Sequence, residues 1–132
     1  MSKIDKTVDI FIGGKDRKMR FDINGILELE ARIPEKNILI LMGKGATFPL
    51  DTLINAVWIG LKYQDKLLDR KKVQNWVADY ISQNENGYEK LAGLVYGSIG
   101  LSGLTGGKVS LFEDVIEKAK MIGTDEEIDE KN

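Results

Sequence analysis

The 132-residue chain contains neither cysteine nor histidine, and only two prolines. The absence of cysteine excludes disulfides, thiolate chemistry and cysteine-ligated zinc or iron–sulfur sites. The absence of histidine removes the commonest general base and the commonest nitrogen ligand for metals. An enzyme built from this chain would depend on carboxylates, lysines, tyrosines and hydroxyls alone. We therefore expect a protein that is not an enzyme and that binds neither a cofactor nor a metal.

The chain also lacks a large excess of charge of either sign and has no long apolar run. The 19 Lys and Arg residues nearly balance the 21 Asp and Glu residues, for a formal net charge of −2. This balance argues against a nucleic-acid-binding surface, although Arg70, Lys71 and Lys72 open a helix in a pattern that could suggest a helix-turn-helix. No apolar segment reaches the ~20 residues that span a membrane, and no signal peptide is evident. We expect a soluble, cytoplasmic protein without membrane contact.

Two alternating segments near the N-terminus predict a β-hairpin. Residues 7–12 (TVDIFI) and 17–22 (RKMRFD) alternate between apolar and polar side chains, and the sequence GGKD separates them. Glycine tolerates the positive φ of a tight turn. A hairpin of two strands is only marginally stable by itself in water, so it must lie against helices or pair with another chain. Pairing of its edge between copies would give a homo-oligomer.

Apolar residues at helical spacing follow the hairpin. Asp22 or Asn24 can cap the first helix, Pro34 ends it, and Pro49 suits the first turn of another. The spacing predicts helices over about residues 24–33, 50–61, 70–83, 88–99 and 110–122. The predicted fold is therefore α+β and predominantly helical, with the N-terminal β-hairpin packed on a bundle of about four to five helices.

A short, fully apolar run lies between the first two of these helices. Periodicity cannot distinguish a strand from a helix over so few residues, and we favour a helix because Gly43 and Gly45 can end it. Its side chains either belong to the core or form an exposed patch for a partner. The run is our candidate for partner binding, and it comprises Ile38, Leu39, Ile40, Leu41 and Met42.

A glycine-rich stretch, GSIGLSGLTGGKVS at residues 97–110, superficially suggests a phosphate-binding loop. The pattern GxxxxGK[ST] fails because Ser102 stands where glycine is needed and Val109 where a hydroxyl is needed. Gly93, Gly97 and Gly100 would instead share one helix face and let a neighbouring helix approach closely.

The rest of the stretch predicts a joint, after which Ser110 can form a capping box with Glu113. We therefore divide this single domain into a body (1–100), a glycine-rich joint (101–109), a C-terminal helix (110–123) and an acidic, disordered tail (124–132). The joint would make the C-terminal helix a movable arm.

The order of these elements resembles that of the tail assembly chaperones of long-tailed bacteriophages and gene transfer agents. The resemblance covers about residues 8–96 and rests on Ile12-Gly13-Gly14-Lys15, Arg20-Phe21, Leu27-Glu28-Leu29-Glu30, Ala56-Val57-Trp58-Ile59-Gly60-Leu61 and Asp69. It implies a non-enzymatic protein of the bacterial host cytoplasm. Such a protein binds the tape measure protein, keeps it soluble and helps to recruit major tail tube protein subunits.

Two other classes of function stay open from the sequence. The chain could be a structural component of the virion, in the tail or in the head–tail connector. It could also be a small enzyme that uses carboxylates, with or without a metal ion.

Overall fold

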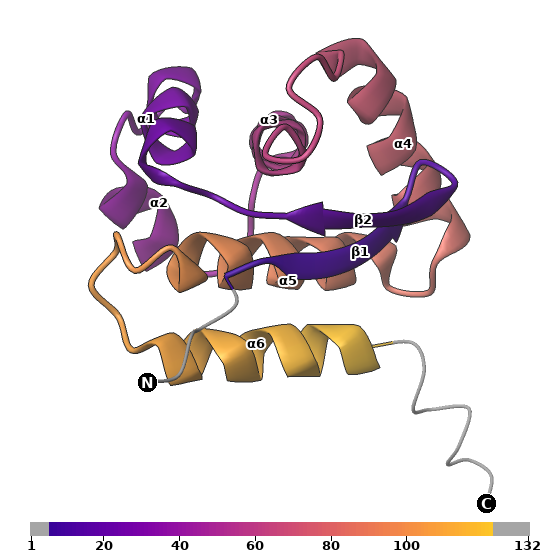
Figure 1. Cartoon of the computed structure of the whole chain (residues 1–132). Helices are drawn as coiled ribbons and strands as arrows, with labels where there is room; N and C mark the ends of the chain where they lie inside the picture. Colours follow the sequence, from indigo (N-terminus) through magenta and orange to yellow (C-terminus); the bar gives the residue numbers. More distant parts are fainter. Residues whose placement is uncertain (1–5, 123–132) are drawn as a thin grey trace, which may run out of the picture.

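The computed structural model describes residues 6–122, which form one two-stranded sheet and six helices (Figure 1). This arrangement confirms the predicted α+β, predominantly helical fold with an N-terminal hairpin. In chain order the elements are β1 (Val8–Ile12), β2 (Lys15–Met19), α1 (Ile23–Arg32), α2 (Ile38–Gly43), α3 (Leu50–Leu61), α4 (Arg70–Gln83), α5 (Gly87–Leu101) and α6 (Val109–Met121).

The hairpin turns at the predicted Gly-Gly pair, but its second strand is Lys15–Met19 and not residues 17–22, so the last two residues of GGKD belong to the strand. Gly13 and Gly14 have φ values of 65° and 81°, which side chains other than glycine rarely adopt. The strands pair antiparallel from Val8↔Met19 to Ile12↔Lys15. Along β1 every second side chain is buried, so the inner face of the hairpin belongs to the core while the outer face meets solvent.

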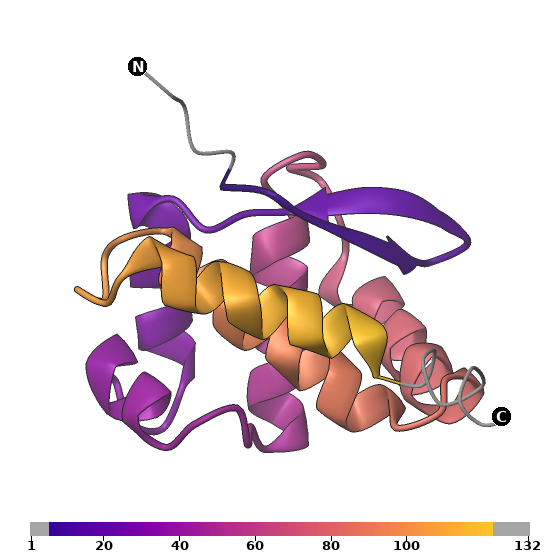
Figure 2. The same cartoon turned by 90° about the horizontal axis from the view of Figure 1, so that it is seen from below.

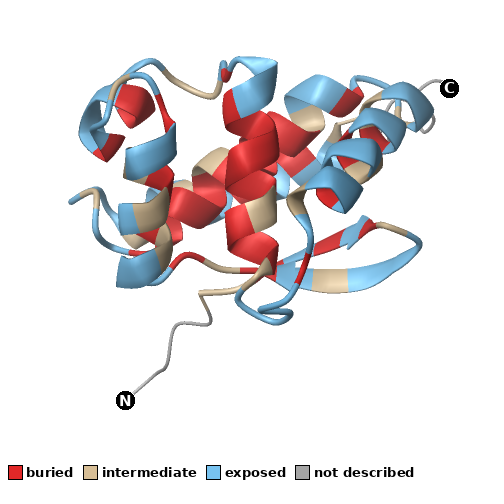
Figure 3. Ribbon diagram, turned by 90° about the horizontal axis from the view of Figure 1, so that it is seen from above, coloured by how far each residue is buried: buried red, intermediate tan, exposed pale blue. Residues whose placement is uncertain are grey.

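Helix α5 lies at the centre of the molecule. It packs against α3 and α4 on one side and against α6 on the other. Figure 1 shows α6 as the lowest layer, and Figure 2, from below, shows it running along α5. In Figure 3 the buried residues concentrate on α3 and α5, which cross near the middle of the fold.

The helix ends test the predicted boundary signals. Asp22 caps α1, because its carboxylate accepts a hydrogen bond from the N–H of Gly25 at 2.9 Å. Helix α1 ends before Pro34 and α3 begins directly after Pro49, as predicted. The prediction of a capping box at Ser110 is wrong. Helix α6 starts at Val109, which already packs against the core, so Ser110 lies inside the first turn.

The glycine face of α5 is confirmed, and α6 is the helix that approaches it. A Cβ atom on Gly93 would lie 2.8 Å from the Cβ of Ala119. A Cβ on Gly97 would collide with Ile116, and one on Gly100 would collide with the ring of Phe112. Real Cβ atoms do not approach one another so closely, so only glycine permits this spacing of the two helices.

The predicted joint corresponds to the loop between α5 and α6. Gly103 and Gly106 have φ values of 78° and 82° there. The loop returns α6 onto the body, so in this structure the predicted arm is docked along α5. The predicted acidic tail, residues 124–132, lies outside the described residues. No helix within residues 6–122 is long and apolar enough to cross a membrane.

Candidate functional site

The structure divides the apolar run that the sequence singled out. Helix α2 forms there, as predicted, and three of the five side chains face the core: Ile38, Leu41 and Met42. Leu39 and Ile40 point outward, with 57% and 53% of their surface exposed. The candidate for partner binding is thereby reduced to these two side chains.

Helix α1 adds two further exposed aliphatic side chains, Ile23 and Leu27, at 55% and 56% exposure. Their spacing of four residues places them on one face of the helix, and Glu30 continues that face. The Glu30 carboxylate accepts a hydrogen bond from the backbone N–H of Ile38 at 2.8 Å. This flank of α1 therefore faces the first turn of α2. We call Ile23, Leu27, Leu39 and Ile40 the α1–α2 apolar surface.

Polar contacts hold α2 in this orientation. The Asn37 side-chain oxygen accepts hydrogen bonds from the N–H groups of Leu39 and Ile40, at 2.8 and 3.1 Å, and so caps the helix. At the other end, Lys44 and Glu35 form an ion pair at 2.7 Å. The hydrogen bond from Lys44 holds the pKa of Glu35 below its ordinary value. The outward direction of Leu39 and Ile40 is thus fixed at both ends of α2.

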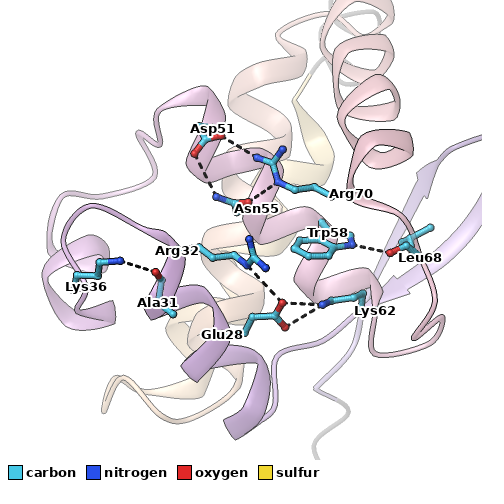
Figure 4. A network of polar contacts seen from close by, with 10 residues as sticks. All are labelled: Glu28, Ala31, Arg32, Lys36, Asp51, Asn55, Trp58, Lys62, Leu68 and Arg70. Atoms are coloured by element: carbon cyan, nitrogen blue, oxygen red, sulfur yellow. Dashed lines mark hydrogen bonds and ion pairs between the residues drawn. The ribbon is translucent and has the colours of Figure 1, made fainter.

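A second polar network fixes α1 against α3 (Figure 4). Glu28 accepts a hydrogen bond from Lys62 at 2.8 Å and pairs with Arg32 at 3.6 Å. The same two cations lie over the ring of Trp58, whose N–H donates to the carbonyl of Leu68 at 2.8 Å. The flank of α1 that meets α3 therefore carries Glu28 and Arg32, whereas the flank toward α2 carries Ile23 and Leu27 together with Glu30.

Sequence reasoning missed Ile23 and Leu27. The sequence analysis used Leu27 only within the Leu27-Glu28-Leu29-Glu30 motif of the family resemblance, and it gave Ile23 no role. Ile26, Leu29 and Ile33 are the residues that α1 and its C-cap bury. The helical spacing contains the missing signal, because Ile23 and Leu27 are four apart and lie off the Ile26–Leu29–Ile33 stripe.

The two α1 glutamates serve different partners, as their spacing of two residues predicts. Glu28 contacts Lys62 at the C-cap of α3, and Glu30 contacts the backbone of α2. In residues 6–122 no three acidic side chains lie close enough to form a metal-binding group. Burial raises the pKa of Tyr80 to about 12, so this phenol stays protonated at neutral pH. The α1–α2 apolar surface is suited to contact with another apolar surface.

Ser102, one of three serines in the glycine-rich stretch, makes local hydrogen bonds to the backbone. The Ser102 hydroxyl donates to the carbonyl of Ile99 at 2.6 Å and accepts the N–H of Leu104 at 3.1 Å. It therefore satisfies backbone groups at the end of α5.

Comparison with known proteins finds no match among protein-family models, curated proteins or solved structures. The α1–α2 apolar surface and the sequence resemblance therefore carry the functional inference.

Proposed function

We propose that this protein is a phage or prophage tail assembly chaperone that acts in the bacterial host cytoplasm. It binds the tape measure protein, keeps that protein soluble and helps to recruit tail tube subunits. It acts without catalysis and without a cofactor. The observation that supports this proposal is the α1–α2 apolar surface, four half-exposed aliphatic side chains held outward by capped and ion-paired helices.

The chemistry of this surface fits the apolar face of an amphipathic helix. Such a helix presents side chains three and four residues apart, and a pair of packed helices can receive them. Covering four half-exposed aliphatic side chains contributes about 1 kcal/mol each, or about 4 kcal/mol together. The loss of translational and rotational freedom on association offsets about that much, so one such contact alone binds only weakly.

Weak single contacts suit a chaperone that must leave its client. A long helical protein offers many apolar faces, so many copies can bind along it and each can still dissociate quickly. Stable, permanent assembly would call for a larger and more continuous apolar interface.

Co-expression tests the proposal. The partner is the very long helical protein that we expect a neighbouring gene to encode. It should be soluble with the unmodified chain, and insoluble with a Leu39→Ser, Ile40→Ser variant. The matched control is Leu67→Ser, because Leu67 is 94% exposed in the loop between α3 and α4, outside the surface. If the long protein stays insoluble with the unmodified chain, the chaperone proposal is wrong.

A structural role in the virion is the competing outcome. A chaperone leaves the particle, whereas a tail or connector component stays in it in fixed proportion. Mass spectrometry of purified particles distinguishes the two. A stoichiometric amount of this chain in the particles would overturn the chaperone proposal.

A further inference from the structure

The two edges of the hairpin differ in their hydrogen bonding. The outer edge of β2 is occupied, because the N–H of Lys18 donates to the Gln64 side chain and the N–H of Arg20 donates to the carbonyl of Gly60, both at 3.0 Å. These bonds also set the orientation of the strand. The even-numbered residues of β2 direct their backbone groups away from β1.

The register carries this orientation across to β1. Lys18 is opposite Asp9, and Asp16 is opposite Phe11. In an antiparallel ladder, the backbone N–H and C=O groups of two opposite residues either point toward each other and form hydrogen bonds, or all point away from the pair. Asp9 and Phe11 therefore direct their N–H and C=O groups away from β2. Within residues 6–122 no strand pairs with this edge, and no hydrogen bond reaches those four groups.

The space beside this edge is open. Two hollows of about 300 and 320 Å³ adjoin β1, and Phe11, Tyr80 and Asn84 line both of them. Side chains of α4, together with Lys90 of α5 and Lys120 of α6 at the larger hollow, therefore border the edge without filling the space beside it. The Phe11 ring is 63% exposed on the outer face of the hairpin, beside an edge that offers a row of unpaired backbone groups.

We propose that the β1 edges of two copies of this chain pair antiparallel about a two-fold axis at Ile10. Asp9 of each copy then lies opposite Phe11 of the other, and the two hairpins form one four-stranded sheet. This register satisfies every outward group of Asp9 and Phe11 in both copies. A register centred on Asp9 would set two carboxylates directly opposite one another, which is unfavourable.

The aromatic side chains add to the same register. With Asp9 opposite Phe11, the two Phe11 rings are diagonal neighbours across the axis and lie within reach of one another. The pairing uses a different part of the molecule from the α1–α2 apolar surface. It goes beyond the chaperone proposal and does not depend on it.

Analytical ultracentrifugation of the full chain tests the pairing. We expect the sedimentation coefficient to rise with concentration toward that of a dimer. Phe11→Pro removes an outward N–H from each copy while leaving the β1–β2 ladder intact, so it should weaken association by roughly tenfold or more. Phe11→Thr is the matched control, since it keeps the N–H and removes the ring, and it should weaken association less.

Three results would overturn the proposal. The unmodified chain could remain monomeric at every concentration, or Phe11→Pro could associate as tightly as the unmodified chain. Alternatively, Phe11→Thr could weaken association as much as Phe11→Pro, which would make the ring, and not the strand edge, responsible.

Disulfide trapping gives a second measurement that does not depend on the proline variant folding. The natural chain has no cysteine, so introduced thiols are unambiguous. Opposite residues in a hydrogen-bonded pair have Cα atoms about 5.5 Å apart, within disulfide range. An oxidised mixture of an Asp9→Cys variant and a Phe11→Cys variant should give linked dimers, and Asp9→Cys alone should give few. Equal linking in both samples would contradict the register.

Discussion

The C-terminal helix pair and the N-terminal helix pair use opposite kinds of residue at their surfaces. Where α5 meets α6, glycines on one helix receive Phe112, Ile116 and Ala119 from the other. Where α1 meets α2, the outer faces keep aliphatic side chains half exposed. Small residues allow a neighbour to come close and complete an interface within the chain. Large exposed residues leave apolar surface uncovered, and we propose that a partner covers it.

The comparison also separates stability from binding. Ile116 and Ala119 are the buried residues of α6, so the attachment of this helix depends on few side chains. The exposed residues of the α1–α2 apolar surface contribute little to folding because water already reaches them. Substitutions in the first region should alter unfolding, and substitutions in the second should alter partner binding.

The largest expected effect is that of Ile116→Ala. This change removes buried methyl and methylene groups facing Gly97, and we expect it to lower the free energy of unfolding by about 3 kcal/mol. Urea denaturation followed by far-UV circular dichroism measures the change. Leu111→Ala on the same helix is the control, since Leu111 is 57% exposed, and its cost should stay below about 0.5 kcal/mol. Equal costs for the two variants would mean that α6 is not docked through Ile116.

Gly97→Ala and Gly100→Ala should each cost about 2 kcal/mol, because the added methyl collides with Ile116 or Phe112 and pushes α6 away from α5. The same change at Gly43 in α2 meets nothing within 4 Å, so Gly43→Ala should be neutral or slightly stabilising. Thermal unfolding of the three variants makes this comparison. If Gly43→Ala were the most damaging of them, the close packing of α5 and α6 would be refuted.

The double change Leu39→Ser, Ile40→Ser should leave the free energy of unfolding within about 0.5 kcal/mol of the original for each substitution. Because Leu41 and Met42 remain buried, α2 should keep its place. Urea denaturation checks the stability, and the co-expression assay checks the loss of client binding. A large loss of stability would show that these side chains belong to the core.

The smallest expected effect concerns the ion pair of Glu35 with Lys44. The hydrogen bond from Lys44 lowers the pKa of Glu35 in the folded state, so the pair stabilises the fold above the ordinary glutamate pKa. This contribution, below about 1 kcal/mol, is lost as the pH falls through the lowered pKa. Unfolding curves at neutral and acidic pH should show Glu35→Gln less stable than the original chain only at neutral pH. A difference that persists in acid would contradict this account.

Local signals were enough to predict much of the fold. Asp22, Pro34 and Pro49 act on the few residues beside them, so the boundaries of α1 and α3 follow from the sequence. The Gly-Gly turn of the hairpin is equally local. The glycine spacing along α5 also predicted a close neighbour, although nothing local identifies α6 as that neighbour.

What the sequence could not predict depends on contacts between distant residues. Every side chain of the run from Ile38 to Met42 is apolar, so the run has no periodicity to distinguish Leu39 and Ile40 from the buried three. Their exposure follows from the packing of α2 against the rest of the fold. The start of α6 was misplaced because packing of Val109 against the core outweighed the local capping pattern at Ser110.

The cations around the two tryptophans have a practical consequence. The Lys62 Nζ and Arg32 Cζ atoms lie 3.9 and 4.8 Å from the centre of the Trp58 ring. The Arg17 Cζ atom of the hairpin lies 4.1 Å from the centre of the Trp76 ring. Indole fluorescence responds to nearby charge, so each ring reports whether its cations stay in place. The fluorescence of Trp58 therefore reports whether α1 stays packed against α3, and that of Trp76 reports whether the hairpin stays packed against α4. The unlabelled protein thus carries an optical reporter near each of its two proposed contact regions.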